Sequence, residues 1–388
     1  MGLCFAVVTA VAYLWLMRPV APIPRDPSGL VVGRDFLNLW MYGKAAFSAD
    51  PGRWYDLAAY QQELARLLGD GYPGQLWSYP PNIMLLAAPF GLAAYMPALA
   101  VWTVLGIGFL WLSLRGRVSN QVLVATLASP AAVFCLISGQ SALMVTALLV
   151  AAYAWWDKRP ILAGILIGLL TLKPHLGLLL PLALAASGRW RVFIAAGLTT
   201  LVLAGTSVLL FGLEAWLRFF TLGLESQNRG LMDVRGLLTP FCPTIFMNLR
   251  GAGIEYGAAM TVQMVFACLG AMAAGWAFRR NANIDPRLAF ALLLAATVTA
   301  LPYLLIYDTL PLCLAALMLL QHDMLDARGR LLARLVYWLP LLQIGLGQFH
   351  IPGPALIPVL FLLYLVYLAK HRPGTQRMPS APISAAAA

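Results

Sequence analysis

Charged residues are scarce in this chain. Only 11% of its 388 residues are Asp, Glu, Lys or Arg, whereas 61% are hydrophobic, and the mean hydropathy is +0.79. A water-soluble domain carries about 25% charged residues. The deficit excludes an ordinary soluble globular protein and predicts an all-helical, polytopic membrane protein.

Cysteine and metal motifs are missing as well. The five cysteines, Cys4, Cys135, Cys242, Cys268 and Cys313, form no Cys-x-x-Cys pair and no Cys/His motif. Neither a disulfide framework nor a zinc site is therefore predicted. The polar stretches contain no Asp-x-Asp cluster, so we expect no tightly bound divalent metal. Because no basic segment precedes the first apolar run, we expect that run to be a retained span and not a cleaved signal.

Apolar runs of roughly the length of a membrane span, several of them short, follow one another along the chain. We expect about twelve transmembrane helices, with a break in the second near Pro89–Gly91 or Pro97. Residues 1–370 would form one transmembrane domain, and the low-complexity tail 371–388 a disordered segment. The expected spans lie near residues 3–17, 82–114, 119–137, 141–157, 160–172, 174–187, 192–212, 255–278, 287–306, 309–321, 331–347 and 354–370.

Basic residues concentrate in alternate connections between these spans. One side of the predicted membrane carries fifteen basic and four acidic residues, a net charge of +11, and the other carries eleven of each. By the positive-inside rule, both termini are then cytoplasmic, and the loops 18–81 and 213–253 face outward. The same placement indicates that the net charge of the chain serves contact with membrane lipids and not with nucleic acid.

The outer loop 18–81 has helical periodicity of its own. Two amphipathic helices are expected in it, and such helices lie in the membrane interface with their apolar sides toward lipid. The segment LEAWLRFFTLGLE in the second outer loop is again amphipathic. The residues of the two expected apolar faces are Phe36, Trp40 and Phe47, and Leu57, Tyr60, Leu64 and Leu67.

The segment 160–187 is too short for two complete spans. Two helices of about fourteen residues rise about 21 Å each, less than the hydrocarbon core of about 30 Å. Their apex is Lys173-Pro174-His175. A lysine there cannot face lipid at low cost, so we expect it to face a cavity filled with water or ligand. The same argument extends to other polar residues at outer span ends: Asp308, Gln140, Gln348 and His350.

Several ordered segments carry a resemblance to a known family. They are GRDFLNLWMYGKAAFSADPGRWYD, WSYPPNIMLLAAPFGL, SGQSALMVTALL, RPILAGILIGLLTLKPHLGLLLPLAL with GRWR, and PYLLIYDTLPL. Over residues 33–320 the chain resembles glycosyltransferase family 87, a group of GT-C membrane enzymes. The resemblance implies a polyprenyl-phosphate sugar as donor, most often mannose, a lipid or glycan acceptor, inversion at the anomeric carbon, and no bound cofactor. It also implies a bacterial inner membrane and a site facing the periplasm.

The resemblance places the aspartate of the family's first outer loop on Asp35. In that role Asp35 is the general base that takes the proton from the acceptor hydroxyl. The structural alternative is an N-cap for a helix starting at Phe36. Three other acids of this loop, Glu63, Asp50 and Asp56, are alternative bases, but each is expected to be solvated or capping.

A departing phosphate needs cations or other hydrogen-bond donors. Lys173 is the first candidate, with a lysine that snorkels to the membrane surface as its alternative. Arg34 either joins it or balances Asp35, and His175 either joins it or is a hydrogen-bonded core residue. Asp308 has a helix cap as its alternative role, and Trp54 and Trp77 could stack on sugars or belong to an interfacial aromatic belt. The residues expected to line the cavity are Trp40, Tyr79, Gln140, Tyr307, Asp308, Gln348 and His350.

Two other classes of function stay open from the sequence. A transporter or flippase of lipid-linked sugars would show interrupted helices in two related halves, and no internal repeat is visible here. A polymerase or ligase of surface glycans would use arginines of the outer loops, such as Arg229, Arg235 and Arg250. The single large outer loop and the single broken hairpin favour an enzyme over a transporter.

Overall fold

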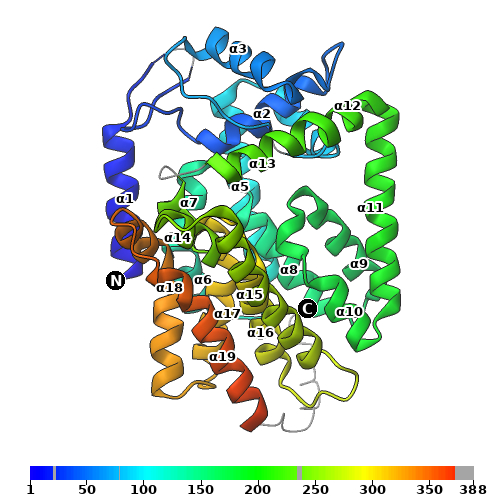
Figure 1. The fold of residues 1–388 in the computed structure, drawn as a ribbon, viewed down its shortest axis with the longest axis vertical. Coiled ribbons are helices and arrows are strands. Elements are labelled where there is room, and N and C mark those ends of the chain that lie inside the picture. Colours follow the sequence, from blue (N-terminus) through cyan, green and yellow to red (C-terminus); the bar gives the residue numbers. More distant parts are fainter. Residues whose placement is uncertain (21–22, 78, 234–237, 372–388) are drawn as a thin grey trace, which may run out of the picture.

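The computed structural model describes residues 1–20, 23–77, 79–233 and 238–371. Arg235 and residues 372–388 of the predicted tail 371–388 lie outside the described residues, and His371 ends the last helix instead of beginning a disordered tail. Helices dominate the described chain (Figure 1). Its extended structure is limited to isolated bridges that join Arg18, Arg25 and Val31. The predicted all-helical class is confirmed.

Four segments are long and apolar enough to cross a membrane by themselves. They are α5 (Tyr95–Leu114), α11 (Trp190–Phe211), α15 (Tyr256–Ala277) and the segment Gly353–His371, which contains α19 (Leu356–His371). The pair α6 (Asn120–Leu127) and α7 (Pro130–Ser138), bent by 52°, would make a fifth. The described chain therefore has four or five candidate spans, and the expected count of twelve is not reached by length and composition.

The other apolar runs are interrupted, often at prolines, and form shorter helices. Proline lacks the backbone N–H that would continue a helix, so it stands at a helix start or breaks a run. Pro160 and Pro286 begin α9 and α16 in this way. These shorter helices are α1 (Gly2–Leu16), α8 (Ala142–Trp155), α9 (Pro160–Leu169), α10 (Leu180–Ser187), α16 (Pro286–Ala300) and α17 (Leu310–Gln321), and the longer but more charged α18 (Ala327–Gly347) joins them.

The second apolar run breaks where the sequence predicts. Helix α4 (Ile83–Gly91) ends at Gly91, and α5 begins four residues later. Gly91 lies against Gly43 of α2 (Arg34–Ala45), where a Cβ atom would be only 2.1 Å from the Gly43 carbonyl carbon. Two glycines thus allow the outer-loop helix α2 to pack directly on α4 near the end of α2.

The outer helices form a layer at one end of the molecule, made of α2, α3 (Leu57–Leu68), α12 (Leu213–Arg218) and α13 (Leu224–Asp233) (Figure 1). The short helix α14 (Ile245–Gly251) ends the second outer loop. The start of α11 and the ends of α15 and α19 lie at the opposite end (Figure 1). The basic connections that flank these helices are therefore separated from the outer layer by the length of the apolar helices.

The apolar faces of α2 and α3 do not face lipid, and this expectation is wrong. Phe36 and Tyr60 have no exposed surface, because the two helices pack around a shared aromatic core. Trp77 fills the space between them, stacked on Tyr42 with ring centroids 3.5 Å apart and edge-on to Tyr60 at 4.8 Å. Phe47 lies beyond the end of α2 and is exposed.

The short hairpin forms as predicted, with Lys173 at its apex. Helix α9 ends at Leu169, two 3-10 turns follow (η2, Leu170–Leu172, and η3, Pro174–Gly177), and α10 returns. Gly164 and Gly168 let α9 pack closely on α11, since a Cβ atom on Gly164 would lie 2.4 Å from the Ala195 Cβ. The hairpin thereby fixes Lys173 in the interior, where only 4% of the residue is exposed.

Candidate active site

Asp35 lies in the first turn of α2 and does not cap it. The N-cap is Gly33, whose left-handed φ of 68° suits glycine, and the helix has no side-chain cap. The capping alternative for Asp35 is therefore wrong. Its side chain is half-buried. The carboxyl group interacts with the charges of Arg34 and Lys173 and with the side chains of Tyr307 and Gln140.

Burial dominates the electrostatics of Asp35 and raises the pKa of its carboxyl group above the ordinary aspartate value. The charges of Arg34 and Lys173 and hydrogen bonds from Tyr307 and Gln140 act in the opposite direction but do not cancel the effect of burial. A carboxylate with a raised pKa binds a proton more tightly than a solvated one. The position thus has the property that a general base requires.

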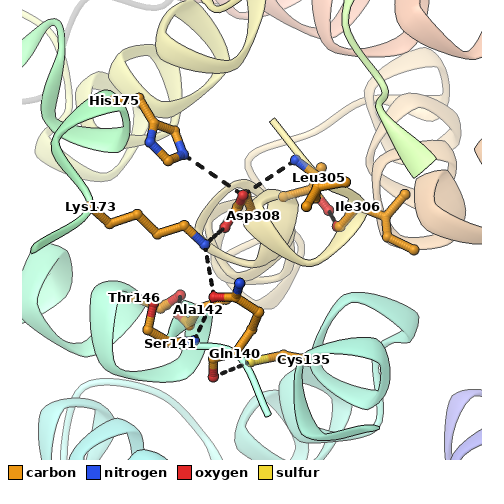
Figure 2. Close-up of polar contacts among 11 residues, drawn as sticks. Cys135, Gln140, Ser141, Ala142, Thr146, Lys173, His175, Leu305, Ile306 and Asp308 are labelled. Atoms are coloured by element: carbon orange, nitrogen blue, oxygen red, sulfur yellow. Dashed lines mark hydrogen bonds and ion pairs between the residues drawn. The ribbon is translucent and has the colours of Figure 1, made fainter. Parts of the chain in front are cut away.

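Lys173 turns inward to a carboxylate. Its Nζ atom donates to Oδ1 of Asp308 at 2.5 Å and to Oε1 of Gln140 at 3.3 Å (Figure 2). The ammonium also lies 4.9 Å from the centre of the Tyr307 ring. The snorkelling alternative is therefore wrong, and a buried carboxylate, not an open cavity, balances the charge. Two of the three ammonium hydrogens are used by these contacts.

Asp308 joins two roles that the sequence left as alternatives. Its Oδ2 atom accepts a hydrogen bond from the Leu305 N–H at 3.3 Å, which caps the 3-10 turn η6 (Ile306–Thr309) at the entrance to α17. The other oxygen pairs with Lys173, and His175 Nε2 lies 3.8 Å from Oδ2 (Figure 2). Asp308 is 2% exposed, so this cap is also a buried counterion.

Gln140 and Tyr79 complete the polar cluster. Gln140 follows Gly139, the left-handed C-cap of α7, where a Cβ atom would lie 2.6 Å from the Cβ of Phe36. This close approach brings the end of α7 to the start of α2. The Tyr79 side chain interacts with Gln140 and with the charges of Lys173 and Asp35. We call Asp35, Tyr79, Gln140, Lys173, His175, Tyr307 and Asp308 the polar cluster.

Other residues expected at the site lie elsewhere. Trp40 is buried in the outer-layer core, where its Nε1 atom donates to the Ala93 carbonyl oxygen at 3.0 Å and Lys44 lies over its ring. Trp54 and Trp77 belong to the same core. Gln348 and His350 are exposed on the turn after α18, and no contact among the described residues joins them to the polar cluster.

The three other acids of the first outer loop that the sequence offered as bases have structural partners. Asp56 is the N-cap of α3 and accepts hydrogen bonds from the N–H groups of Ala58 and Ala59. Glu63 pairs with Arg66 at 2.6 Å, and Asp50 pairs with Arg218 at 2.8 Å. Asp56 is a cap, as expected, and Asp50 is exposed and ion-paired, whereas Glu63 is half-buried in its ion pair. Among these four acids, Asp35 is the one that belongs to the polar cluster.

Two residues next to the polar cluster were not predicted. Asn82 is 3% exposed and donates from Nδ2 to the Thr171 hydroxyl at 3.3 Å, two residues before Lys173, whereas its Oδ1 atom has no partner among the described residues. Tyr303 interacts electrostatically with Asp308 and Asp35. Both residues could have been found in the sequence as polar residues at the end of an apolar run, Asn82 in Tyr-Pro-Pro-Asn and Tyr303 in Pro-Tyr-Leu-Leu-Ile-Tyr-Asp.

The arginines of the second outer loop hold that loop together. Arg250 is buried and donates to the carbonyl oxygens of Met232 at 2.7 Å and Ile254 at 3.0 Å, and Arg229 pairs with Glu225. No described group of three or more His, Cys, Asp and Glu residues is arranged to hold a metal ion. In the described part of the outer loops, these observations therefore do not indicate a second binding site for a charged ligand or a metal ion.

Comparison with known proteins gives one match. The family model described as glycosyltransferase family 87 matches residues 77–307, more than half of the chain. No curated protein and no solved structure matches. Asp35 and Asp308 lie outside the matched region, which contains the other five residues of the polar cluster, Tyr79, Gln140, Lys173, His175 and Tyr307. The chain therefore belongs to glycosyltransferase family 87 and is a membrane glycosyltransferase.

Proposed function

We propose that this enzyme transfers a sugar, with mannose as the favoured one, from a polyprenyl phosphate to a lipid or glycan acceptor, with inversion of the anomeric carbon. The observation that carries the proposal is that Asp35 of the first outer loop lies close enough to Lys173, at the apex of the hairpin, for the lysine charge to act on its carboxyl group. A base and a cation in one polar cluster meet the two needs of glycosyl transfer, because one activates the acceptor and the other receives the leaving phosphate.

Asp35 acts as the general base. The acceptor oxygen attacks the anomeric carbon and forms the new glycosidic bond, while its proton passes to the Asp35 carboxylate. The bond between the anomeric carbon and the phosphate oxygen breaks, and the electron pair leaves with the polyprenyl phosphate. The burial that raises the pKa of Asp35 makes it a stronger base, and Tyr307 and Gln140 orient the carboxylate.

Lys173, Arg34 and His175 bind the donor phosphate. Lys173 has one ammonium hydrogen left after its bonds to Asp308 and Gln140, and this hydrogen can serve a phosphate oxygen. The His175 Nε2 atom is buried, lies 3.8 Å from the Asp308 Oδ2 atom and has no hydrogen-bond partner among the described residues. Bonds between charged donors and phosphate are stronger than neutral ones. The chemistry proposed here uses no bound cofactor or divalent metal.

The proposed setting is a bacterial inner membrane, crossed about twelve times, with both termini in the cytoplasm and the polar cluster facing the periplasm. The support is the separation of the basic connections from the outer layer along the apolar helices (Figure 1). Cytoplasmic loops carry an excess of Lys and Arg. The lipid-linked donor and acceptor, together with membrane lipids, are the proposed partners, and nucleic acid is not.

Turnover by the purified full-length protein in detergent tests the proposal, with a short-chain prenyl-phosphate mannose and candidate lipid acceptors. We expect Asp35→Asn to lower kcat by about 10²–10⁴-fold, the contribution of a general base. Asp56→Asn is the matched control, because asparagine caps a helix as well as aspartate and activity should stay near wild type. An Asp35→Asn rate within a few-fold of wild type would show that Asp35 is not the base. The anomeric configuration of the product, measured by NMR, tests inversion.

A further inference from the structure

One face of the first helix of the second outer loop is apolar and uncovered. Leu213 and Leu217 of α12, Phe220 of the following π-helical turn η4 (Phe219–Gly223) and Leu224 at the start of α13 are between 37% and 60% exposed. Their spacing of four, three and four residues places them on one side of the helix. We call these four residues the apolar stripe.

The other two faces of this helix are fixed to the protein. Ala215 packs on Gly52, where a Cβ atom on the glycine would lie 2.9 Å from the Ala215 Cα. Gly223 packs on the ring of Tyr55, with an equivalent distance of 3.0 Å. Arg218, on the polar flank, pairs with Asp50 at 2.8 Å and with Glu214 at 2.9 Å. The apolar stripe therefore has a defined direction, away from the outer-layer core.

The apolar stripe continues the lipid-facing surface of α11. This helix is a candidate span, and its last turn presents Leu209 and Leu210 with 86% and 65% exposure. Gly212, with φ of 82°, turns the chain sharply, and Leu213 begins the stripe. The Trp216 Nε1 atom donates back to the Ser207 hydroxyl of α11 at 2.9 Å and holds α12 across the end of the span (Figure 1). Tryptophan in this position is typical of the membrane interface.

We infer that residues 213–224 lie flat on the leaflet beside the outer layer, with the apolar stripe inserted at the boundary of the lipid acyl chains. An amphipathic helix whose polar side is held by the protein binds a membrane in this way. The inference rests on the membrane character of the chain and not on the proposed reaction. It also moves the interfacial role from α2 and α3, whose apolar faces are buried, to the second outer loop.

The docked helix is connected to the polar cluster by few contacts. Gly223 touches the Tyr55 ring, and the Tyr55 hydroxyl donates to the Tyr79 carbonyl oxygen at 2.7 Å. Tyr79 in turn interacts with Gln140 and with the charges of Asp35 and Lys173. Tyr55 and Tyr79 therefore link the helix that carries the apolar stripe to the polar cluster.

Fluorescence quenching in reconstituted vesicles tests this inference. Leu217→Cys and Phe220→Cys are made in the full-length chain with the exposed Cys4 and Cys268 replaced by serine, and each is labelled with bimane. The vesicles contain phosphatidylcholine and phosphatidylglycerol, with and without brominated phosphatidylcholine. Gln62→Cys, exposed on α3, is the matched control in the outer layer. We expect brominated lipid to quench the fluorescence of the stripe labels at least about three-fold more strongly than that of the control label. Aqueous iodide should instead quench the control label more strongly than the stripe labels.

Equal quenching of the stripe and control labels by brominated lipid would overturn the inference. Protection of the stripe labels from both quenchers would also overturn it, because a second copy of the chain or another protein would then cover the stripe. Leu213→Cys is the third probe position, so failure of one variant to fold leaves two measurements.

Discussion

Asp35 and Asp308 are carboxylates in one polar cluster, but their surroundings differ. Asp308 is 2% exposed, and its two oxygens are engaged by Lys173 and by the Leu305 N–H. Asp35 is half-buried and has no salt bridge among the described residues, and burial leaves its pKa raised. A carboxylate with complete partners stabilises a structure, whereas one that is buried without full compensation is available for chemistry. The comparison supports the proposed division, in which Asp308 positions Lys173 and Asp35 takes the proton.

The Lys173→Met variant removes the buried ion pair with Asp308, and of the variants considered it should have the largest effect on stability and activity. It leaves Asp308 buried without its counterion, a change that costs about 3–5 kcal/mol in folding free energy. It also removes the ammonium group that is proposed to bind the phosphate of the donor substrate, so the KM for the prenyl-phosphate sugar should rise. Thermal unfolding in detergent and initial rates at varied donor concentration measure the two effects.

The double variant Lys173→Met/Asp308→Asn separates stability from catalysis. Removal of both buried charges should restore most of the lost stability, because a buried ion pair contributes little net free energy compared with neutral replacements. Donor affinity should stay low, since the cation is still absent. A double variant with wild-type donor affinity would show that the pair is only structural and that Lys173 does not bind the phosphate.

Tyr307→Phe sharpens the chemical side of the comparison through its pH dependence. A base must be ionised to work, so kcat/KM should rise with pH through the raised pKa of Asp35. The hydrogen bond from Tyr307 stabilises the carboxylate and lowers that pKa, and its removal should shift the acidic limb of the profile to higher pH. Tyr153→Phe is the control, because its hydroxyl donates to the Pro286 carbonyl oxygen outside the polar cluster. An acidic limb that stays in place or moves to lower pH in Tyr307→Phe would contradict the role of Asp35.

The sequence was informative wherever a local pattern determined the outcome. Hydropathy predicted the all-helical membrane class, and the short length of the segment 160–187 predicted a hairpin with Lys173 at its apex. The break in the second apolar run near Gly91 was visible as Pro89 and Gly91. In each case the physical cause, a proline, a glycine or a helix too short to span, acts within a few residues of its effect.

Pairings between distant segments were beyond the sequence. Lys173 and Asp308 are 135 positions apart, and neither residue type identifies the other as its partner. The periodicity of α2 and α3 showed which side is apolar but not what covers it, because Trp77 comes from a separate segment of the loop. Amphipathic helices of the two outer loops therefore looked alike in sequence, although only the second loop carries the uncovered apolar stripe.

Asp56→Ala is the smallest change that bears on the comparison. Asp56 lies in the same outer loop as Asp35, but it caps α3 through the N–H groups of Ala58 and Ala59. Loss of an N-cap costs about 1 kcal/mol, so we expect a slightly lower unfolding temperature and faster hydrogen exchange at the start of α3. Turnover should remain near wild type, because the cap holds α3 and does not belong to the polar cluster. A loss of turnover larger than the loss of folded protein would mean that Asp56, and not Asp35 alone, supports the reaction.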